Sequence, residues 1–190
     1  MSSEIEDTAS ETKDTRSGIK DEIISWVKTI VLAVIFAVFI NNFIIVNAYV
    51  PSGSMENNIM TGDRLIASRI SYIFSDPKRF DILVFRYPDD ESVLYVKRLI
   101  GMPGDIIEIK NGVVYINDEI LEGDQKFHKE LATDTLGPFL VPENHYFMLG
   151  DNRNSSHDSP DWNNKFLSRD NILGKAVFRY FPNFKIFNDA

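Results

Sequence analysis

Two serines separated by one glycine, in the segment VPSGSM (50–55), carry the most suggestive chemistry in this chain. A serine hydroxyl is hardly ionised at neutral pH, so it needs a neighbouring base before it can act as a nucleophile. If the segment is extended, Ser52 and Ser54 point to the same side. Ser54 could then attack a carbonyl, while the Ser52 hydroxyl and the Ser54 backbone N–H donate to the resulting oxyanion. The alternative is a flexible Ser-Gly-Ser turn.

The base predicted for this serine is Lys97, in the segment VLYVKRLI (93–100). Because side chains alternate along a strand, Lys97 shares a face with the apolar Val93, Tyr95 and Leu99. Removing an ammonium group from water favours its neutral form, and a neutral amine can accept a proton from serine. The alternative is a structural lysine whose stem covers apolar surface and whose head reaches solvent.

An apolar stretch precedes these residues and predicts an anchor. Residues 23–46 are long and apolar enough for a helix that crosses a hydrocarbon core of ~30 Å. The stretch begins late and lacks a small-residue cleavage site at its end, which favours a retained transmembrane helix over a cleaved signal peptide. The polar, acidic residues 1–22 are expected to be a disordered tail, which leaves residues 47–190 for the catalytic domain.

Basic residues predict the orientation of the anchor. Lys13, Arg16, Lys20 and Lys28 precede or begin the apolar stretch, and the next basic residue is Arg64. Because lysine and arginine are retained on the cytoplasmic side, we expect a cytoplasmic N-terminus and an extracytoplasmic domain in a single-pass cell-membrane protein.

The pattern beyond the anchor predicts a mainly β domain built of antiparallel sheet. Short segments rich in aromatic and β-branched residues are typical of strands, and Asn111-Gly112 favours a tight hairpin over 105–118. No long helical pattern separates the strands, and 119–141 and 152–171 are expected to be longer excursions. The predicted strands are 81–88, 92–101, 105–110, 113–118, 145–151 and 174–182.

Composition excludes several classes of function. The formal net charge of -8 and the absence of a basic stripe argue against a nucleic-acid partner. The chain has no cysteine and three histidines without metal-ligand spacing, so we expect no metal site. No ATP or organic cofactor is implied, and the sequence makes no prediction about oligomeric state.

The motifs in their order resemble bacterial type I signal peptidase, in its short form with one anchor. The resemblance spans roughly residues 28–187 and rests on an apolar helix followed by PSGSM, GDRLIASR, FDILVFRYP, YVKRLIGMPGD, GDNRNSSHDS and GKAVFRYFP. It implies a β protease domain that removes signal peptides from exported preproteins. Ser54 would be the nucleophile, Lys97 the general base, Ser52 an oxyanion donor and Ser156 a hydroxyl that orients the lysine. Asp151, Arg153 and Asp158 would support the site.

The same resemblance places Val50, Tyr95 and Val96 beside the substrate groove. Shallow pockets there would select small side chains of the Ala-X-Ala type, because larger ones clash. The precursor is expected to lie extended beside a strand edge, with backbone hydrogen bonds holding it.

The site is expected to lie close to the bilayer surface. Eight residues link Val46 to Ser54, and an extended chain of that length spans about 26 Å. The aromatic clusters YIF (72–74) and FPNFKIF (181–187) are expected to pack in the core, with contact to membrane lipid as the alternative.

Two departures from the family pattern concern the outer parts of the site. Asn57 and Asn58 stand where the family usually has proline and threonine, and Pro160 stands where it has arginine. Proline carries no charge, so the ion pair expected there is absent and the role of Asp158 becomes less certain.

Three alternatives remain open from the sequence. Ser156, His157 and Asp158 invite a Ser-His-Asp interpretation, although adjacent residues usually diverge in space. A self-cleaving repressor could use a Ser-Lys dyad, but it would need a DNA-reading module, and none is apparent. An anchored β domain that binds exported peptides without cutting them is the third.

Overall fold

The computed structural model describes residues 2–128 and 133–187, in two units, Met1–Asn42 and Phe43–Ala190. The first unit is formed by the helix α1 (Ser2–Phe43). Its part Glu22–Phe43 is long and apolar enough to cross a membrane, by length and composition. The apolar side chains of this part are exposed, as expected for a helix whose partner is lipid.

The helix differs from the prediction at both ends. It includes residues 2–22, where composition predicted disorder, and it ends at Phe43 rather than at residue 46. Upstream extension is favoured because each residue added to an existing helix gains a hydrogen bond without new nucleation. Downstream, the β-branched Ile45 and Val46 already belong to the first strand.

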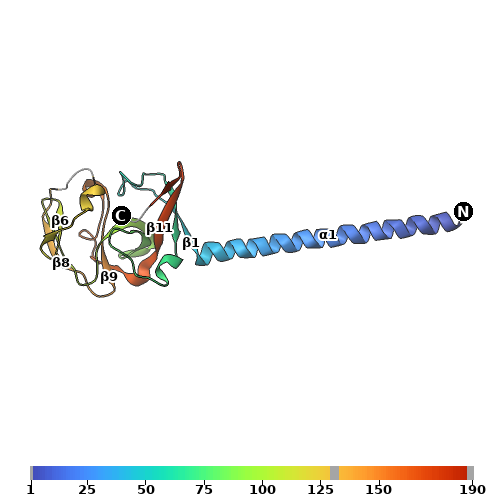
Figure 1. Ribbon diagram of the computed structural model, residues 1–190, viewed down its shortest axis with the longest axis horizontal. Helices are drawn as coiled ribbons and strands as arrows, with labels where there is room; N and C mark the ends of the chain where they lie inside the picture. Colours follow the sequence, from blue (N-terminus) through green and yellow to red (C-terminus); the bar gives the residue numbers. More distant parts are fainter. Residues whose placement is uncertain (1, 129–132, 188–190) are drawn as a thin grey trace. The chain divides into compact units, whose positions relative to one another are not determined.

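The second unit is built of two antiparallel sheets (Figure 1). In the larger sheet the strand order is β1-β2-β11-β3-β4-β9-β10, with β12 paired to β11, and in the smaller it is β7-β6-β5-β8. The strands of the larger sheet are β1 (Ile45–Tyr49), β2 (Arg64–Ser68), β3 (Ile82–Tyr87), β4 (Asp90–Gly101), β9 (His145–Leu149), β10 (Leu167–Ser168), β11 (Ile172–Phe181) and β12 (Lys185–Ile186). Those of the smaller are β5 (Ile106–Lys110), β6 (Val113–Ile116), β7 (Glu119–Ile120) and β8 (Leu136–Leu140).

The mainly antiparallel β fold predicted from the sequence is confirmed. Each of the six predicted segments contains a strand, and Asn111 and Gly112 join β5 to β6 with φ of 52° and 77°. Such positive values belong to the primed hairpin turn that this residue pair favours. The expected excursions contain short elements instead: β7, β8, β10 and the 3₁₀ helices η2 (Asp124–Lys126), η3 (Arg153–Ser155) and η4 (Arg169–Asn171). A further 3₁₀ helix, η1 (Ile70–Tyr72), follows β2.

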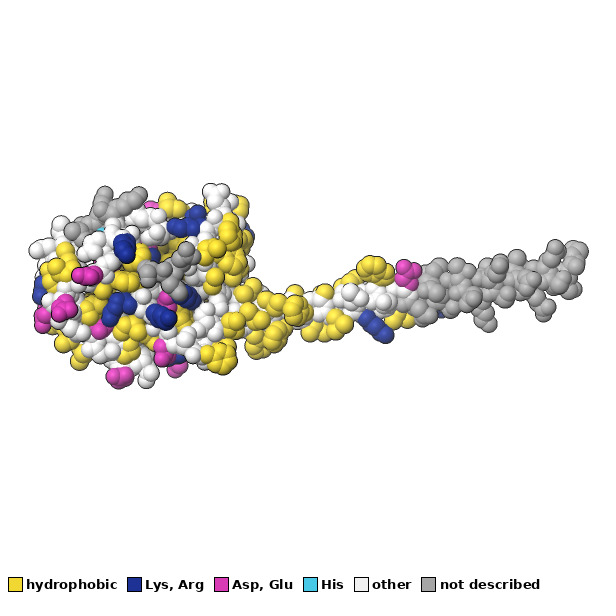
Figure 2. All heavy atoms as spheres, in the orientation of Figure 1, with side chains coloured by type: hydrophobic (Ala, Val, Ile, Leu, Met, Phe, Trp, Pro, Cys, Tyr) yellow, Lys and Arg dark blue, Asp and Glu magenta, His cyan; other side chains and the backbone are white. Residues whose placement is uncertain are grey.

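The aromatic clusters are divided between core and surface. Tyr72 and Phe187 pack against buried clusters, as predicted. Phe74, Phe181 and Phe184 are instead 95%, 55% and 69% exposed, so core packing was the wrong prediction for them. Hydrophobic side chains gather on the domain where Figure 1 draws β1 and β11 (Figure 2).

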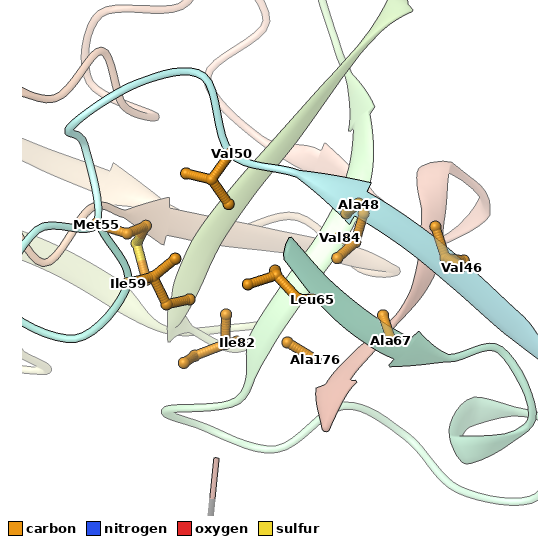
Figure 3. Packing of buried hydrophobic residues seen from close by; sticks show 10 residues of the cluster. All are labelled: Val46, Ala48, Val50, Met55, Ile59, Leu65, Ala67, Ile82, Val84 and Ala176. Atoms are coloured by element: carbon orange, nitrogen blue, oxygen red, sulfur yellow. The ribbon is translucent and has the colours of Figure 1, made fainter. Parts of the chain in front are cut away.

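The core that supports the functional residues lies against β1, β2 and β3 (Figure 3). We call residues 52–59 the serine loop, because they contain Ser52 and Ser54. Met55 and Ile59 of this loop are fully buried in the cluster, near Val50 and Leu65. Two apolar anchors therefore fix the serine loop to the sheet.

Replacing Met55, one of the two buried side chains that hold the serine loop, tests this arrangement. Met55→Ala is expected to lower the free energy of unfolding by about 2–5 kcal/mol, since it removes a fully buried side chain and leaves a cavity. Met60→Ala is the matched control, because Met60 is 46% exposed, and its expected effect is within about 0.5 kcal/mol. Urea unfolding in detergent measures both. Equal effects would contradict the anchoring role of Met55.

Candidate active site

A pocket of about 380 Å³ brings the predicted reactive residues together. Its walls come from residues 47–52 and 93–97, with Ser54, Val84, Ser155 and His157. Six predicted site residues line it: Ser52, Ser54, Lys97, Val50, Tyr95 and Val96.

The strands that border the pocket have open edges. Within the described part of the chain, β1 pairs with β2 alone, so its other edge is free. Residues 94–97 of β4 pair with β3, and pairing of β4 with β9 starts only at Arg98. An extended peptide in the pocket could therefore add backbone hydrogen bonds on either side.

The two serine hydroxyls meet although their segment is not extended. The serine loop turns, with the N–H of Glu56 donating to Gly53 O at 3.1 Å and that of Ile59 to Met55 O at 2.9 Å. Ser52 Oγ nevertheless lies 3.4 Å from Ser54 Oγ. In residues 2–128 and 133–187, the Ser54 N–H has no acceptor, so it is free to donate to a bound group.

Lys97 is a buried lysine, with 3% of its side chain exposed. The structural alternative, in which its head reaches solvent, is thus wrong. Its Nζ donates to Ser156 Oγ at 2.5 Å and pairs with Asp158 Oδ1 at 2.9 Å. Among the described residues, no hydrogen bond joins Nζ to Ser54 Oγ. Catalytic hydrogen bonds often tighten only when substrate is bound.

The segment 150–158 holds the partners of Lys97 in place. Ser156 donates to Asp158 Oδ1, and the Gly150 N–H donates to Asp158 Oδ2 at 2.8 Å. A Cβ at Gly150 would overlap both Ser156 Oγ and the backbone oxygen of Ser54. The absence of a side chain at Gly150 therefore lets this segment approach the serine loop. Asp158 keeps an ion pair although Pro160 replaces the family's arginine.

Asp151 and Arg153 support the site from behind. Asp151 is fully buried and accepts from Arg98 Nε and Nη2, each at 2.7 Å. Arg153 donates to Asp124 at 3.0 and 2.6 Å and to Gly150 O at 3.0 Å. Burial would raise the pKa of Asp124, but hydrogen bonds from His128 and Arg153 outweigh it and hold the pKa below its usual value.

Aromatic side chains form one wall of the pocket. Tyr95 stacks on Tyr87 with ring centroids 4.5 Å apart. His157 lies beside them, with Nε2 3.2 Å from Tyr87 Oη and Nδ1 4.0 Å from Asp161 Oδ2. Because the His157 ring contacts Tyr87 and Asp161 rather than Asp158, a Ser156-His157-Asp158 triad does not form.

Sequence reasoning missed three supports of the site. Arg98, Asp124 and Asn152 were not among the site residues that the sequence predicted. Asn152 donates from N to Ser54 O and from Nδ2 to Gly53 O, both at 3.0 Å. The asparagine within GDNR was the available signal, since buried loops recruit such side chains for backbone groups. No group of three or more His, Cys, Asp or Glu among the described residues is arranged to hold a metal ion.

Comparisons with known proteins agree on one family. Residues 23–181 match the family model described as signal peptidase, peptidase S26. A probable signal peptidase I-2 of Synechocystis is 40% identical over 82% of this chain and 72% of its own length. Signal peptidase I P of Bacillus subtilis subsp. natto is 37% identical over 86% and 91%. A solved signal peptidase I from Enterococcus faecalis is 32% identical, with a TM-score of 0.45 over 53% of this chain and 97% of its own.

Proposed function

Because the chain belongs to the signal peptidase S26 family and is a peptidase that removes signal peptides, we propose that it acts through a Ser54–Lys97 dyad. The observation that carries this proposal is the shared pocket, which is lined by Ser54 and by Lys97, the one lysine among its lining residues.

In the proposed reaction, the neutral Lys97 amine accepts the Oγ proton as Ser54 attacks the scissile carbonyl. The Lys97 Nζ turns from Ser156 and Asp158 toward Ser54 Oγ for this step. The ammonium then gives its proton to the leaving amine, and the peptide bond breaks. Water attacks the carbonyl of the acyl-enzyme, with Lys97 again accepting a proton. The ester bond to Ser54 Oγ then breaks, the Lys97 ammonium returns its proton to Oγ, and the acyl peptide is released.

The oxyanion is proposed to be stabilised by two donors. Ser52 Oγ lies close enough to Ser54 Oγ to reach the oxygen of a carbonyl under attack. The Ser54 N–H is the second donor, because it makes no hydrogen bond within the described chain. Donors placed before the charge develops stabilise the transition state more than the ground state.

The precursor is proposed to bind as an extended strand between the open edges of β1 and β4. Val50, Tyr95 and Val96 would form the pockets beneath its side chains, and Val50 is only 3% exposed. Such shallow walls favour small residues of the Ala-X-Ala type. Cleavage is expected to be lost when leucines replace both alanines of a precursor, and undiminished cleavage would exclude this specificity.

The apolar N-terminal helix fits a membrane-anchored enzyme. We propose that its N-terminus is cytoplasmic and the β unit extracytoplasmic, as the distribution of basic residues indicates. The exposed Phe181, Phe184 and Ile186 are proposed to contact lipid headgroups and acyl chains.

Removing either member of the dyad tests the proposed function. Purified full-length protein in detergent is incubated with a secretory precursor. Ser54→Ala and Lys97→Ala are each expected to lower processing by at least about 10³-fold, since dyad members act as a unit. Ser75→Ala and Lys126→Ala, at exposed positions, are matched controls with wild-type activity. Undiminished processing by either dyad variant would exclude the assignment.

The proposed base also predicts a pH dependence. The kcat/KM value is expected to rise from neutral to alkaline pH, because only the neutral amine accepts a proton. Burial, then the charges of Asp158 and Asp89, raise the pKa of Tyr95, so this phenol stays neutral over the range. His157→Gln is the control and is expected to retain the rise. A flat pH profile of the wild-type protein would contradict the assignment of Lys97 as the base.

Single cysteines test orientation and lipid contact, because the chain has no cysteine of its own. Leu140 ends β8 and Phe184 follows β11, and Figure 1 draws these two strands at different ends of the β unit. In intact cells Leu140→Cys is expected to react with an impermeant maleimide. With an environment-sensitive dye in vesicles, only residue 184 is expected to report an apolar surrounding. Failure to label residue 140, or identical spectra, would overturn the respective proposal.

A further inference from the structure

The side chain of Asn58 connects the serine loop to the buried ion pair behind the site. Its Nδ2 donates to Asp151 Oδ2 at 2.8 Å and to the backbone oxygen of Phe127 at 3.3 Å. We propose that Asn58 is a positioning residue that holds Ser54 in its reactive place by tying the serine loop to Asp151. The inference rests on the proposed role of Ser54.

Asp151 is a rigid acceptor for this bond. It is fully buried, and both of its oxygens already accept from Arg98. The Arg98 guanidinium in turn lies over the ring of Phe127, with Cζ 3.7 Å from the centroid, and donates from Nη1 to Phe80 O at 2.7 Å. The Arg98 guanidinium is thus held by Asp151, by the ring of Phe127 and by Phe80 O. Because Arg98 is fixed, its partner Asp151 offers Asn58 a fixed acceptor.

The bond completes a junction of three elements. Arg98 follows Lys97 on β4, and Asp151 precedes Asn152, whose two donors hold the backbone oxygens of Gly53 and Ser54. Asn58 holds the other end of the serine loop to the same carboxylate. The loop is thus fastened on both sides of Ser54, with Met55 and Ile59 anchored beneath it.

The backbone of the loop is suited to this contact. Asn57 has a φ of 97°, which asparagine tolerates and which proline, fixed near −65°, cannot adopt. Lys185 Nζ donates to Asn58 O at 3.2 Å, so the backbone of the same residue is also held. The two asparagines that depart from the family pattern therefore act together: Asn57 permits the turn, and Asn58 uses it to reach Asp151.

Loss of the bond is expected to affect chemistry more than binding. Asn58 does not line the pocket, whereas its loop carries the nucleophile. A displacement of the nucleophile by about 1 Å can cost about 10²-fold in rate. Asn58→Ala is therefore expected to lower kcat by about 10- to 100-fold with little change in KM.

Asn58→Asp gives a signature that a merely structural position would lack. The ionised carboxylate cannot donate and repels Asp151, whereas the protonated acid keeps one O–H donor. The activity of Asn58→Asp relative to wild type at the same pH is thus expected to fall as pH rises, while that of Asn58→Ala stays constant.

Precursor cleavage by full-length protein is measured across pH, with thermal unfolding as the check that each variant folds. Asn171→Asp and Asn171→Ala are matched controls, because Asn171 Nδ2 donates to Glu91 Oε1 at 3.2 Å in an exposed pair. A wild-type protein that does not cleave overturns the proposed function. Cleavage by wild type with an unchanged kcat in Asn58→Ala, or parallel pH profiles of Asn58→Asp and Asn58→Ala, overturns this inference alone.

Discussion

The buried ion pair between Arg98 and Asp151 is the constraint on which the site depends. It joins the strand that carries Lys97 to the segment that carries Ser156 and Asp158. Burying two charges is unfavourable unless they are paired and well hydrogen-bonded, and removing one partner of such a pair typically costs about 3–5 kcal/mol. The bidentate geometry and the ring of Phe127 over the guanidinium meet that condition. The pair therefore fixes which residues of the two elements face each other.

The alternation of side chains on β4 converts this constraint into a functional arrangement. Because successive side chains of a strand point to opposite faces, Arg98 points to one face of β4 and Lys97 to the other. The ion pair of Arg98 with Asp151 therefore also fixes where the Lys97 amine lies along the segment 150–158. Ser156 and Asp158 then contact the amine from the segment that Asp151 begins. These two partners fix the position of the amine, and a buried polar group needs such partners because burial without them is costly.

Much of this site could be predicted from the sequence, because local patterns carried it. The alternation in 93–100 placed Lys97 among apolar neighbours, and motif order grouped it with Ser54. The pairing of Arg98 with Asp151 could not be predicted from pattern, since 53 residues separate them and other carboxylates compete for each arginine. Strand β1 was hidden at the end of the apolar stretch, because a continuous apolar run fits a helix or a buried strand equally. The exposure of Phe184 likewise depends on tertiary packing that hydrophobicity alone does not reveal.

The open edges of β1 and β4 leave backbone hydrogen-bonding groups without a strand partner beside the pocket. Unpaired strand edges promote aggregation, and proteins usually cover or interrupt them. Here two such edges border the pocket that contains Ser54 and Lys97. Under the proposed function, an extended precursor pairs with these edges through its backbone, so precursors of different sequence can bind alike. Selection then falls to the few side chains that point into the pocket. If Ser54 is the nucleophile, as proposed, the open edge beside it would account for both broad acceptance of precursors and selection of small residues.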